Sequence, residues 1–430
     1  MSLTVLLIVV FLFGIALVAF EEKIGVNKSA TALLMSVLMW VIISLFGVDV
    51  SSEIVSEQLG EVSETLFFVM GALVMVELVD VHGGFSVISS AIKTRSQRKL
   101  LWVVCFITFL LSAVLDNIAT AVIMVALVRK FIDEQHIRWV FAGMIIIAAN
   151  AGGSFSPVGD VTTILLWTGG NVTPEHQIVT LFLPALAFMI VPLVLTSQFY
   201  LKKDATFAPK ELSSTTRSNF EVAKVHRVVL LALGVSTMAL VPVFQNWSTL
   251  PPFMRILMGL AFMWIYTDLM YRSISKKTPK MEQFGVSKVL ARIDMSTILF
   301  FLGVLMSVAA MKVAGALTQV GAGLESAIEE PLLISFVIGV MSSFVDNVAL
   351  VAATQGMYPI AEVGTYVVNS EFWTFLAYCA VTGGSLLIIG SATGVTVMGM
   401  EKLTFGYYLK RFTLLAIVGY VAGAAVYLLF

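Results

Sequence analysis

The chain has 430 residues, of which 59% are hydrophobic and 12% are charged, and its formal net charge is −1. Soluble domains carry roughly 25% charged residues, so this composition excludes a soluble globular protein and any large soluble domain. We therefore predict an all-α polytopic membrane protein that lies in a lipid bilayer and has no nucleic-acid partner.

Apolar runs in chain order predict the membrane-embedded helices. In the first half they cover residues 3–20, 29–47, 64–81, 99–115, 118–128, 139–168 and 178–200. In the second half they cover 228–245, 254–271, 294–312, 331–345, 347–358, 372–399 and 412–430. The first run lacks the basic segment and the cleavage site of a signal peptide, so we interpret it as a retained span.

Two pairs of these runs are short, and each pair surrounds an Asp-Asn dipeptide, Asp116-Asn117 or Asp346-Asn347. Short apolar runs favour re-entrant segments over complete spans. We therefore predict two re-entrant helical hairpins, 99–128 and 331–358, each with an Asp-Asn pair at its tip. Carboxylates inside a bilayer are costly, so both tips are candidates for a functional site.

Lys and Arg lie on one side of the predicted membrane if each hairpin returns to the side from which it came. Apart from Arg255 and Lys312, they all fall in segments 21–28, 93–99, 129–138, 201–227, 272–292 and 401–411. The loops opposite them are 48–63, 169–177, 246–252, 313–330 and 359–371. The positive-inside rule assigns the basic segments to the cytoplasm and both chain termini to the outside.

The two halves of the chain repeat one another. Residues 65–71 align with 297–303 at an offset of 232, and the Asp-Asn pairs follow at an offset of 230. Gly152-Gly-Ser154 aligns with Gly383-Gly-Ser385 at an offset of 231. The equivalent spans run in opposite directions, so we predict two inverted-topology repeats, each with a re-entrant hairpin and an unwound transmembrane helix.

This repeat divides the chain into four predicted regions. They are N-terminal scaffold spans (1–62), repeat 1 (63–200), cytoplasmic linkers with two connecting spans (201–293) and repeat 2 (294–430).

The polar residues of the hairpins and of the glycine-rich interruptions predict a site for a small cation. Hard cations prefer oxygen ligands, and glycine allows unwinding that frees backbone carbonyls. The predicted cation ligands are Asp116, Asn117, Asp160, Asp346 and Asn347, assisted by Ser154, Thr162, Thr163 and Ser385. Burial favours the neutral form of a carboxylate, so protons and cations would compete for this site.

Other interpretations of these residues stay open. The Asp-Asn pairs could only cap the returning helices, and Gly-Gly-Ser could mark close helix packing. Glu77, Asp80 and His82 either lie at the membrane interface or take part in proton access or pH sensing. No Ser/His/Asp or paired His/Glu metal motif lies at membrane depth, so we expect neither an enzyme nor a cofactor.

The chain resembles the NhaD-type sodium/proton antiporters of the ion transporter superfamily from about residue 65 to 427. The motifs that carry the resemblance are Leu115-Asp116-Asn117-Ile-Ala-Thr120, Phe344-Val-Asp346-Asn347-Val-Ala and Asn150-Ala-Gly-Gly-Ser154-Phe-Ser-Pro-Val-Gly159-Asp160-Val-Thr162-Thr163. The resemblance adds Asn150 to the candidate ligands. It implies a homodimer in the bacterial inner membrane, with a scaffold and a mobile transport region, that exports Na⁺ or Li⁺ in exchange for H⁺ by alternating access.

The same superfamily contains sodium-coupled dicarboxylate carriers, so sodium-driven symport of an anion is the alternative function. Those carriers have Ser-Asn-Thr at each tip, whereas this chain has Asp-Asn-Ile and Asp-Asn-Val. An Asp would repel a carboxylate substrate, which favours a cation. A membrane scaffold without transport activity would leave the paired carboxylates with no role.

Overall fold

The computed structural model describes residues 2–19, 21–87, 92, 94, 96–201, 223–244, 250–275, 289–388 and 390–430. The helices of the first half are α1 (Leu3–Ala19), α2 (Glu21–Ile24), α3 (Lys28–Leu45), α4 (Ser52–Val81), α6 (Gln97–Ser112), α7 (Asn117–Phe131), α8 (Gln135–Phe155), α9 (Val161–Thr168) and α10 (Pro174–Phe199). Those of the second half are α11 (Lys224–Val243), α12 (Pro252–Ser275), α14 (Met295–Val313), α15 (Ala316–Ala327), α16 (Pro331–Met341), α17 (Asn347–Met357), α18 (Glu371–Gly383), α19 (Ala392–Glu401), α20 (Phe405–Arg411) and α21 (Thr413–Leu429).

Helices long and apolar enough to cross a bilayer confirm the multi-pass membrane class. In the described residues they are α3, α4, α8, α10, α11, α12 and α14. The pair α20 and α21 passes the same test together but is bent by 51°. The all-α prediction is confirmed for the part of the chain that the structure describes.

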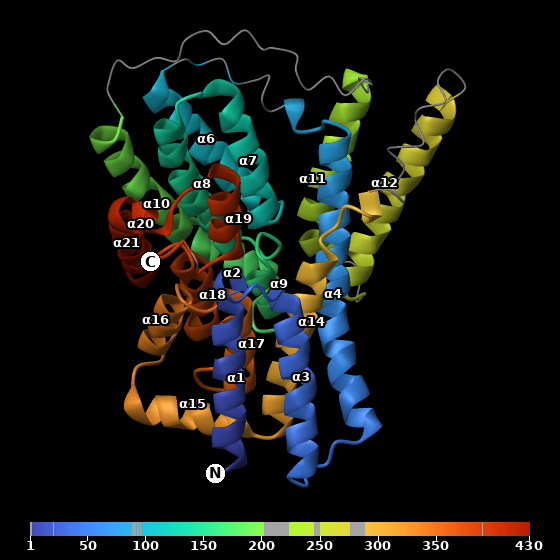
Figure 1. Ribbon diagram of the computed structural model, residues 1–430, viewed down its shortest axis with the longest axis vertical. Coiled ribbons are helices and arrows are strands. Elements are labelled where there is room, and N and C mark those ends of the chain that lie inside the picture. Colours follow the sequence, from blue (N-terminus) through green and yellow to red (C-terminus); the bar gives the residue numbers. More distant parts are fainter. Residues whose placement is uncertain are drawn as a thin grey trace.

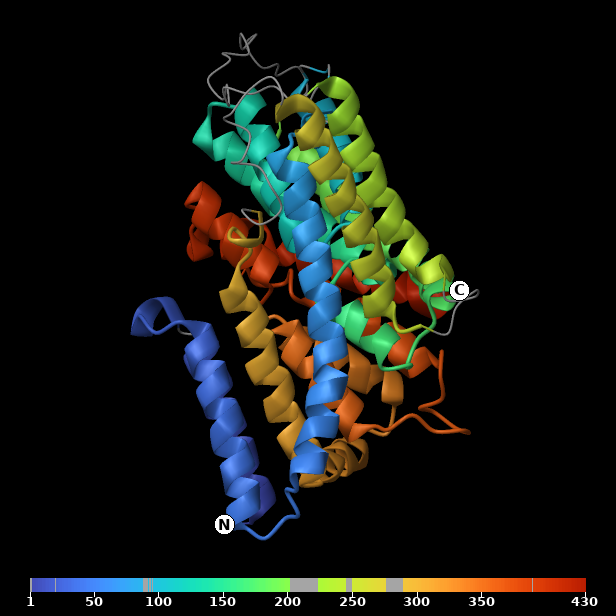
Figure 2. The same cartoon turned by 90° about the vertical axis from the view of Figure 1, so that its right-hand side faces the viewer.

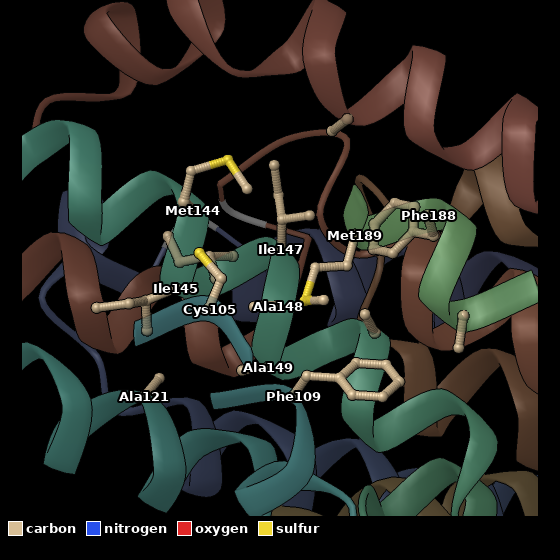
Figure 3. Close-up of a cluster of buried hydrophobic side chains, with 14 of the residues drawn as sticks. Cys105, Phe109, Ala121, Met144, Ile145, Ile147, Ala148, Ala149, Phe188 and Met189 are labelled. Carbon is tan, nitrogen blue, oxygen red and sulfur yellow. The ribbon is translucent and has the colours of Figure 1, made fainter. Parts of the chain in front are cut away.

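The helices form two bodies, each with its own apolar core (Figures 1 and 2). One body contains α6, α7, α8, α10, α16, α18 and α21, and Figure 3 shows part of its core, where Phe109 of α6, Ala148 of α8 and Met189 of α10 meet. The other contains α1, α3, α4, α12 and α14. The short helices α9 and α17 connect the two bodies: α9 packs against α4 and α17 against α14 of the second body, and both pack against α18 of the first.

Helix pairs occur where the sequence predicts the two hairpins. The first pair is α6 and α7, and the second is α16 and α17. Figure 1 shows the first pair in the upper part of the molecule and α16 in the lower part. Asp116 and Asp346 are the residues directly before α7 and α17, so each Asp-Asn pair lies at the predicted turn.

The two halves make the same contacts at equivalent positions. Ser112 Oγ donates a hydrogen bond to the Ala149 carbonyl at 2.6 Å, and Ser342 Oγ donates one to the Ala380 carbonyl at 2.6 Å. These hydroxyls each tie a hairpin to the long helix that follows it. The contacts support the predicted repeat, since both partners lie 230 or 231 residues from their counterparts.

Two segments that we predict as external loops are helical instead. Residues 52–63 form the start of α4, where Ser51 caps the helix by accepting a hydrogen bond from Ile54 N at 3.3 Å. Residues 316–327 form α15, which Figure 1 shows lying across the lower end of the molecule. Both segments are too polar for a lipid-spanning run, but helix formation depends on the helix propensity of the residues and not on their hydropathy.

A buried carboxylate joins three helix ends near the segments predicted to be cytoplasmic. Glu401, at the end of α19, is 2% exposed and pairs with Arg129 Nε at 2.5 Å and Arg138 Nε at 3.0 Å. Its backbone carbonyl accepts a hydrogen bond from Trp139 Nε1 at 3.0 Å. The cluster therefore connects the end of α7 and the start of α8 with the second half of the chain.

Replacing Glu401 by Gln should destabilise the protein by about 1–3 kcal/mol, because two guanidinium groups lose their partner. The cost stays below that of a fully buried pair, since Arg129 is 43% exposed and can be hydrated. Thermal unfolding of the purified protein in detergent measures the change. Glu61→Gln is the matched control, because Glu61 pairs with Lys312 at 3.3 Å on the surface and should contribute less than about 1 kcal/mol. Equal shifts in the two variants would contradict the assigned role of Glu401.

Candidate ion-binding site

Each hairpin tip places an Asp at the N-terminus of a helix. The Asp116 carboxylate accepts a hydrogen bond from Ile118 N at 2.6 Å, and the Asp346 carboxylate accepts one from Val348 N at 3.0 Å. Both residues are therefore N-caps of the returning helices α7 and α17. The capping interpretation is correct as a description of local structure, and it leaves the second oxygen of each carboxylate for another partner.

Both long helices that follow the hairpins are interrupted, as predicted. In the first half α8 ends at Phe155 and α9 begins at Val161. In the second half α18 ends at Gly383 and α19 begins at Ala392. Each new helix starts with a polar cap: Asp160 accepts from Thr162 N at 2.7 Å, and Ser391 accepts from Gly394 N at 3.1 Å.

The glycines beside these interruptions also serve close packing. A Cβ atom at Gly152 would lie 2.9 Å from the carbonyl carbon of Phe109 in α6. A Cβ atom at Gly383 would lie 2.6 Å from the carbonyl carbon of Gly339 in α16. The packing interpretation of Gly-Gly-Ser is thus confirmed, and the helix break follows within the same segment.

The amide groups of both tips converge on a single carboxylate. Asn117 Nδ2 donates a short hydrogen bond to Asp160 Oδ2, and Asn347 Nδ2 donates to Asp160 Oδ1 at 3.4 Å. Asp160 is only 4% exposed, and both asparagines are buried. Residues from the two halves of the chain therefore meet at Asp160, which is the centre of the candidate site.

Asn150 extends this network into the second half of the chain. Its Oδ1 accepts a hydrogen bond from Asn117 Nδ2 at 3.1 Å. Its Nδ2 donates to Ser385 Oγ at 2.8 Å and to Ser391 Oγ at 3.3 Å. A fully buried asparagine thus links the first hairpin tip to the interruption between α18 and α19.

The remaining predicted ligands lie beside Asp160 or next to the network. Thr163 Oγ1 donates to the Asp160 carbonyl at 2.9 Å. Ser154 Oγ donates to the Ala151 carbonyl at 2.8 Å, within its own helix. Thr162 contacts Asp160 through its backbone N–H. The structure therefore brings Thr162, Thr163 and Ser385 into the network and leaves the Ser154 hydroxyl bonded locally.

Three polar residues at the site are absent from the predicted ligand set. Ser391 caps α19, and its position follows from the repeat, where it aligns with Asp160. The Thr120 and Thr393 hydroxyls are buried and have no hydrogen-bond partner among the described residues. Thr120 belongs to the first hairpin motif, and Thr393 aligns with Thr162, so the sequence contained a signal for both.

Comparison with known proteins assigns the chain to a family. The family model for citrate transporters matches residues 15–375. The chain belongs to this transporter family. It is 41% identical to sodium/proton antiporter 1 of Arabidopsis thaliana over 421 residues, which cover 97% of this chain and 71% of the relative. It is 38% identical to sodium/proton antiporter 2 of the same plant, with 97% of this chain and 98% of the relative covered.

Bacterial relatives of this transporter include the Na(+)/H(+) antiporter NhaD of Halomonas elongata. That protein is 30% identical to this chain, with 98% of this chain and 87% of the relative covered. NhaD of Vibrio cholerae is 29% identical to this chain, with 98% of this chain and 91% of the relative covered. The resemblance to NhaD-type antiporters that the hairpin motifs indicate is therefore confirmed.

A cavity of about 530 Å³ lies between the second body of this transporter and the connecting helices α9 and α17. It is lined by residues of α4, α9, α14 and α17, among them Glu61, Glu64, Thr168, Lys312 and Gln355. The cavity adjoins the C-terminal halves of α9 and α17, and the N-termini of the same two helices carry Asp160 and Asp346. Both helices thus lead from the cavity toward the site.

The C-terminal end of α4 carries Glu77, Asp80 and, as its C-cap, His82. Glu77 pairs with Arg292 at 3.7 Å. His82 Nδ1 donates to the Leu78 carbonyl at 2.6 Å, and its Nε2 forms a short hydrogen bond with Tyr271. Burial lowers the pKa of His82, so Nε2 accepts from the tyrosine hydroxyl at neutral pH. The structure does not join these residues to the network around Asp160 in the described part of the chain.

Proposed function

We propose that this transporter exchanges Na⁺ or Li⁺ for H⁺ by alternating access, at a site formed by Asp116, Asp160 and Asp346 with their amide and hydroxyl neighbours. The observation that supports this most is the convergence of Asn117 and Asn347 on buried Asp160. Both repeats contribute to one carboxylate, as expected for transporters that bind their substrate where two repeats meet.

The chemistry of the site supports a cation as the substrate. A buried carboxylate needs a compensating positive charge, and either a bound proton or a bound sodium ion can supply it. Oxygen atoms of Asp, Asn, Ser and Thr are suitable ligands for a hard cation. If the site holds either a sodium ion or a proton, but not both at once, the outward movement of sodium is coupled to the inward movement of protons.

Symport of sodium with a dicarboxylate is disfavoured by the same residues. The Asp160 network and the N-caps of α7 and α17 beside it contain three carboxylates, Asp116, Asp160 and Asp346. Among the described residues, this hydrogen-bonded group has no Lys or Arg. An anionic substrate would meet three carboxylates there, which repel it. We therefore propose cations as the substrates, as in the antiporter relatives, although the matching family model is named for citrate transport.

Other parts of the proposal rest on the family resemblance and on charge sidedness. We propose a homodimer in the inner membrane of a bacterium, with both termini outside and no cofactor beyond the transported ions. The chain would act as a carrier and not as an enzyme. Glu77, Asp80 and His82 would influence proton access from the cytoplasm, because they lie beside the basic segment that contains Arg292.

Ion flux in proteoliposomes tests this function. Vesicles with an acidic interior should lose their pH gradient when Na⁺ or Li⁺ is added outside, and K⁺ should have no effect. Protein-free vesicles treated alike are the control. Uptake of radiolabelled succinate or citrate driven by Na⁺, without movement of protons against sodium, would instead establish the symport function.

A further inference from the structure

Four helix N-termini meet at the candidate site. The helices are α7, α9, α17 and α19, and their N-caps are Asp116, Asp160, Asp346 and Ser391. Hydrogen bonds join them: Asn117 and Asn347, the first residues of α7 and α17, both donate to Asp160, and Asn150 bridges Asn117 to Ser391. The four positive ends of these helix dipoles therefore point at one small region.

The charges of this region nearly balance. Each helix N-terminus carries about half a positive charge, so four of them supply about two positive charges. The caps supply three carboxylates and one neutral serine. Counted over these helix ends and caps, the difference is about one negative charge, which a single monovalent cation or a single proton neutralises. Lys28, whose charge acts on Asp346, adds the same positive charge in every variant compared below.

Ser391 is the residue that sets this difference, because its position is equivalent to that of Asp160. Both residues cap a helix after an interruption, and both lie against a glycine. A Cβ atom added to Gly153 would lie 3.4 Å from the Asp160 Cβ, and one added to Gly384 would lie 3.0 Å from the Ser391 Cβ. Ser391 is 3% exposed. Asn150 Nδ2 already donates to its hydroxyl, so a donor faces the place that a carboxylate would occupy.

A second observation shows unused polar capacity at the same helix end. The hydroxyl of Thr393, two residues after Ser391, is fully buried and has no hydrogen-bond partner among the described residues. A buried hydroxyl without a partner is unfavourable, so a bound ion or its water is a suitable partner for it. The neutral N-terminus of α19 is thus part of the site, although it carries no formal charge.

We propose that Ser391 determines the valence of the transported ion: a neutral cap at α19 limits the site to one monovalent cation, and a fourth carboxylate would convert it to a site for a divalent cation. This inference rests on the proposed function, because it assigns selectivity to the same site. Asp160 and Ser391 are then equivalent positions, and their combined charge determines the selectivity for ions.

The test compares Ser391→Asp, Asp160→Ser and the double variant that exchanges the two residues, in the full-length protein. Thermal unfolding in detergent is followed with Na⁺, Li⁺, Ca²⁺ or Mg²⁺, because an ion that binds the folded state raises the midpoint temperature. Wild-type protein should be stabilised by Na⁺ and Li⁺ at concentrations at least about tenfold below those of the divalent ions. Ser391→Asp should reverse this order, and Asp160→Ser should lose stabilisation by Na⁺.

The double variant decides between charge and local geometry. It keeps the charge of the wild type, so it should recover the preference for Na⁺ and at least about tenfold more sodium/proton exchange than Asp160→Ser. Ser391→Asn is the matched control, because Asn has the size of Asp without its charge, and it should keep the wild-type order of ions.

Two results would overturn the proposal. One is an unchanged preference for Na⁺ in folded Ser391→Asp, and the other is a loss of Na⁺ binding in Ser391→Asn equal to that in Ser391→Asp. If Ser391→Asp does not fold, a double variant that folds but does not recover Na⁺ binding is equally decisive. Wild-type protein that binds Na⁺ but exchanges no protons would contradict the proposed antiport and leave this inference standing.

Discussion

Asp160→Asn is expected to abolish sodium/proton exchange while the protein still folds. Asp160 accepts hydrogen bonds from the side chains of Asn117 and Asn347 and from Thr162 N. An Asn at this position offers one acceptor oxygen, and its amide group would face one of the two donor amides, because these bond to different oxygens of Asp160. The variant also removes the charge that a bound cation neutralises. We expect the exchange rate at fixed Na⁺ to fall by at least about 100-fold, which corresponds to about 2.7 kcal/mol of lost stabilisation.

Exchange is measured in proteoliposomes, and the folded state is checked by size-exclusion chromatography and by the midpoint of thermal unfolding. Asp49→Asn is the matched control, because Asp49 is exposed in the turn between α3 and α4 and should leave exchange unchanged. Na⁺ should no longer raise the unfolding midpoint of Asp160→Asn. Substantial exchange by Asp160→Asn at the wild-type Na⁺ concentration would show that the site is elsewhere.

Gly383→Ala is expected to destabilise the protein more than any surface substitution. The added methyl group would overlap the backbone of Gly339, at 2.6 Å from its carbonyl carbon and 3.1 Å from its Cα. Backbone atoms within a packed helix cannot rotate away, so α16 and α18 would have to separate. Overpacking of this kind costs about 1–3 kcal/mol, and more when backbone atoms must move. Exchange should fall as well, because α16 positions the second hairpin tip.

The yield of folded protein and its unfolding midpoint in detergent measure this effect. Gly399→Ala in α19 is the matched control, because a Cβ atom there meets no atom within 4 Å. Alanine favours the helix over glycine by about 1 kcal/mol, so the control should be neutral or slightly stabilised. Gly152→Ala, at the equivalent position of the first half, should behave like Gly383→Ala. A Gly383→Ala protein as stable as the control would contradict the close packing of α16 and α18.

The parts of the site that depend on neighbouring residues were predictable from the sequence. Asp116 and Asp346 cap the helices that directly follow them, and short apolar runs on either side indicated both hairpins. The interruptions after Gly152 and Gly383 followed from glycine-rich polar segments in long apolar runs. Backbone preference and capping act over a few residues, so a single sequence reveals them.

Other features depended on residues far apart in the chain and were not predictable. The sequence did not show that Asn117 and Asn347 would share Asp160, or that Asn150 would bridge to Ser385. The helix α15 was also missed, because its residues are too polar to be distinguished from a loop by hydropathy. The Thr4 hydroxyl of α1 donates a hydrogen bond to Gln319 Oε1 of α15 at 2.8 Å, so tertiary contacts also hold this helix in place.

The sequence by itself determined the class of protein, the two hairpin tips, the repeat and the preference for a cation, because these follow from hydropathy, spacing and the charge of local side chains. Only the tertiary structure decided which carboxylate is central. Asp116, Asp160 and Asp346 are equally acidic residues in the sequence, but Asp160 alone among them receives donors from both hairpins. The physical reason is packing. Helix α9 packs against α17 of the second hairpin, and the residue before its cap contacts the first hairpin, because Asn117 N donates to the Gly159 carbonyl at 3.2 Å.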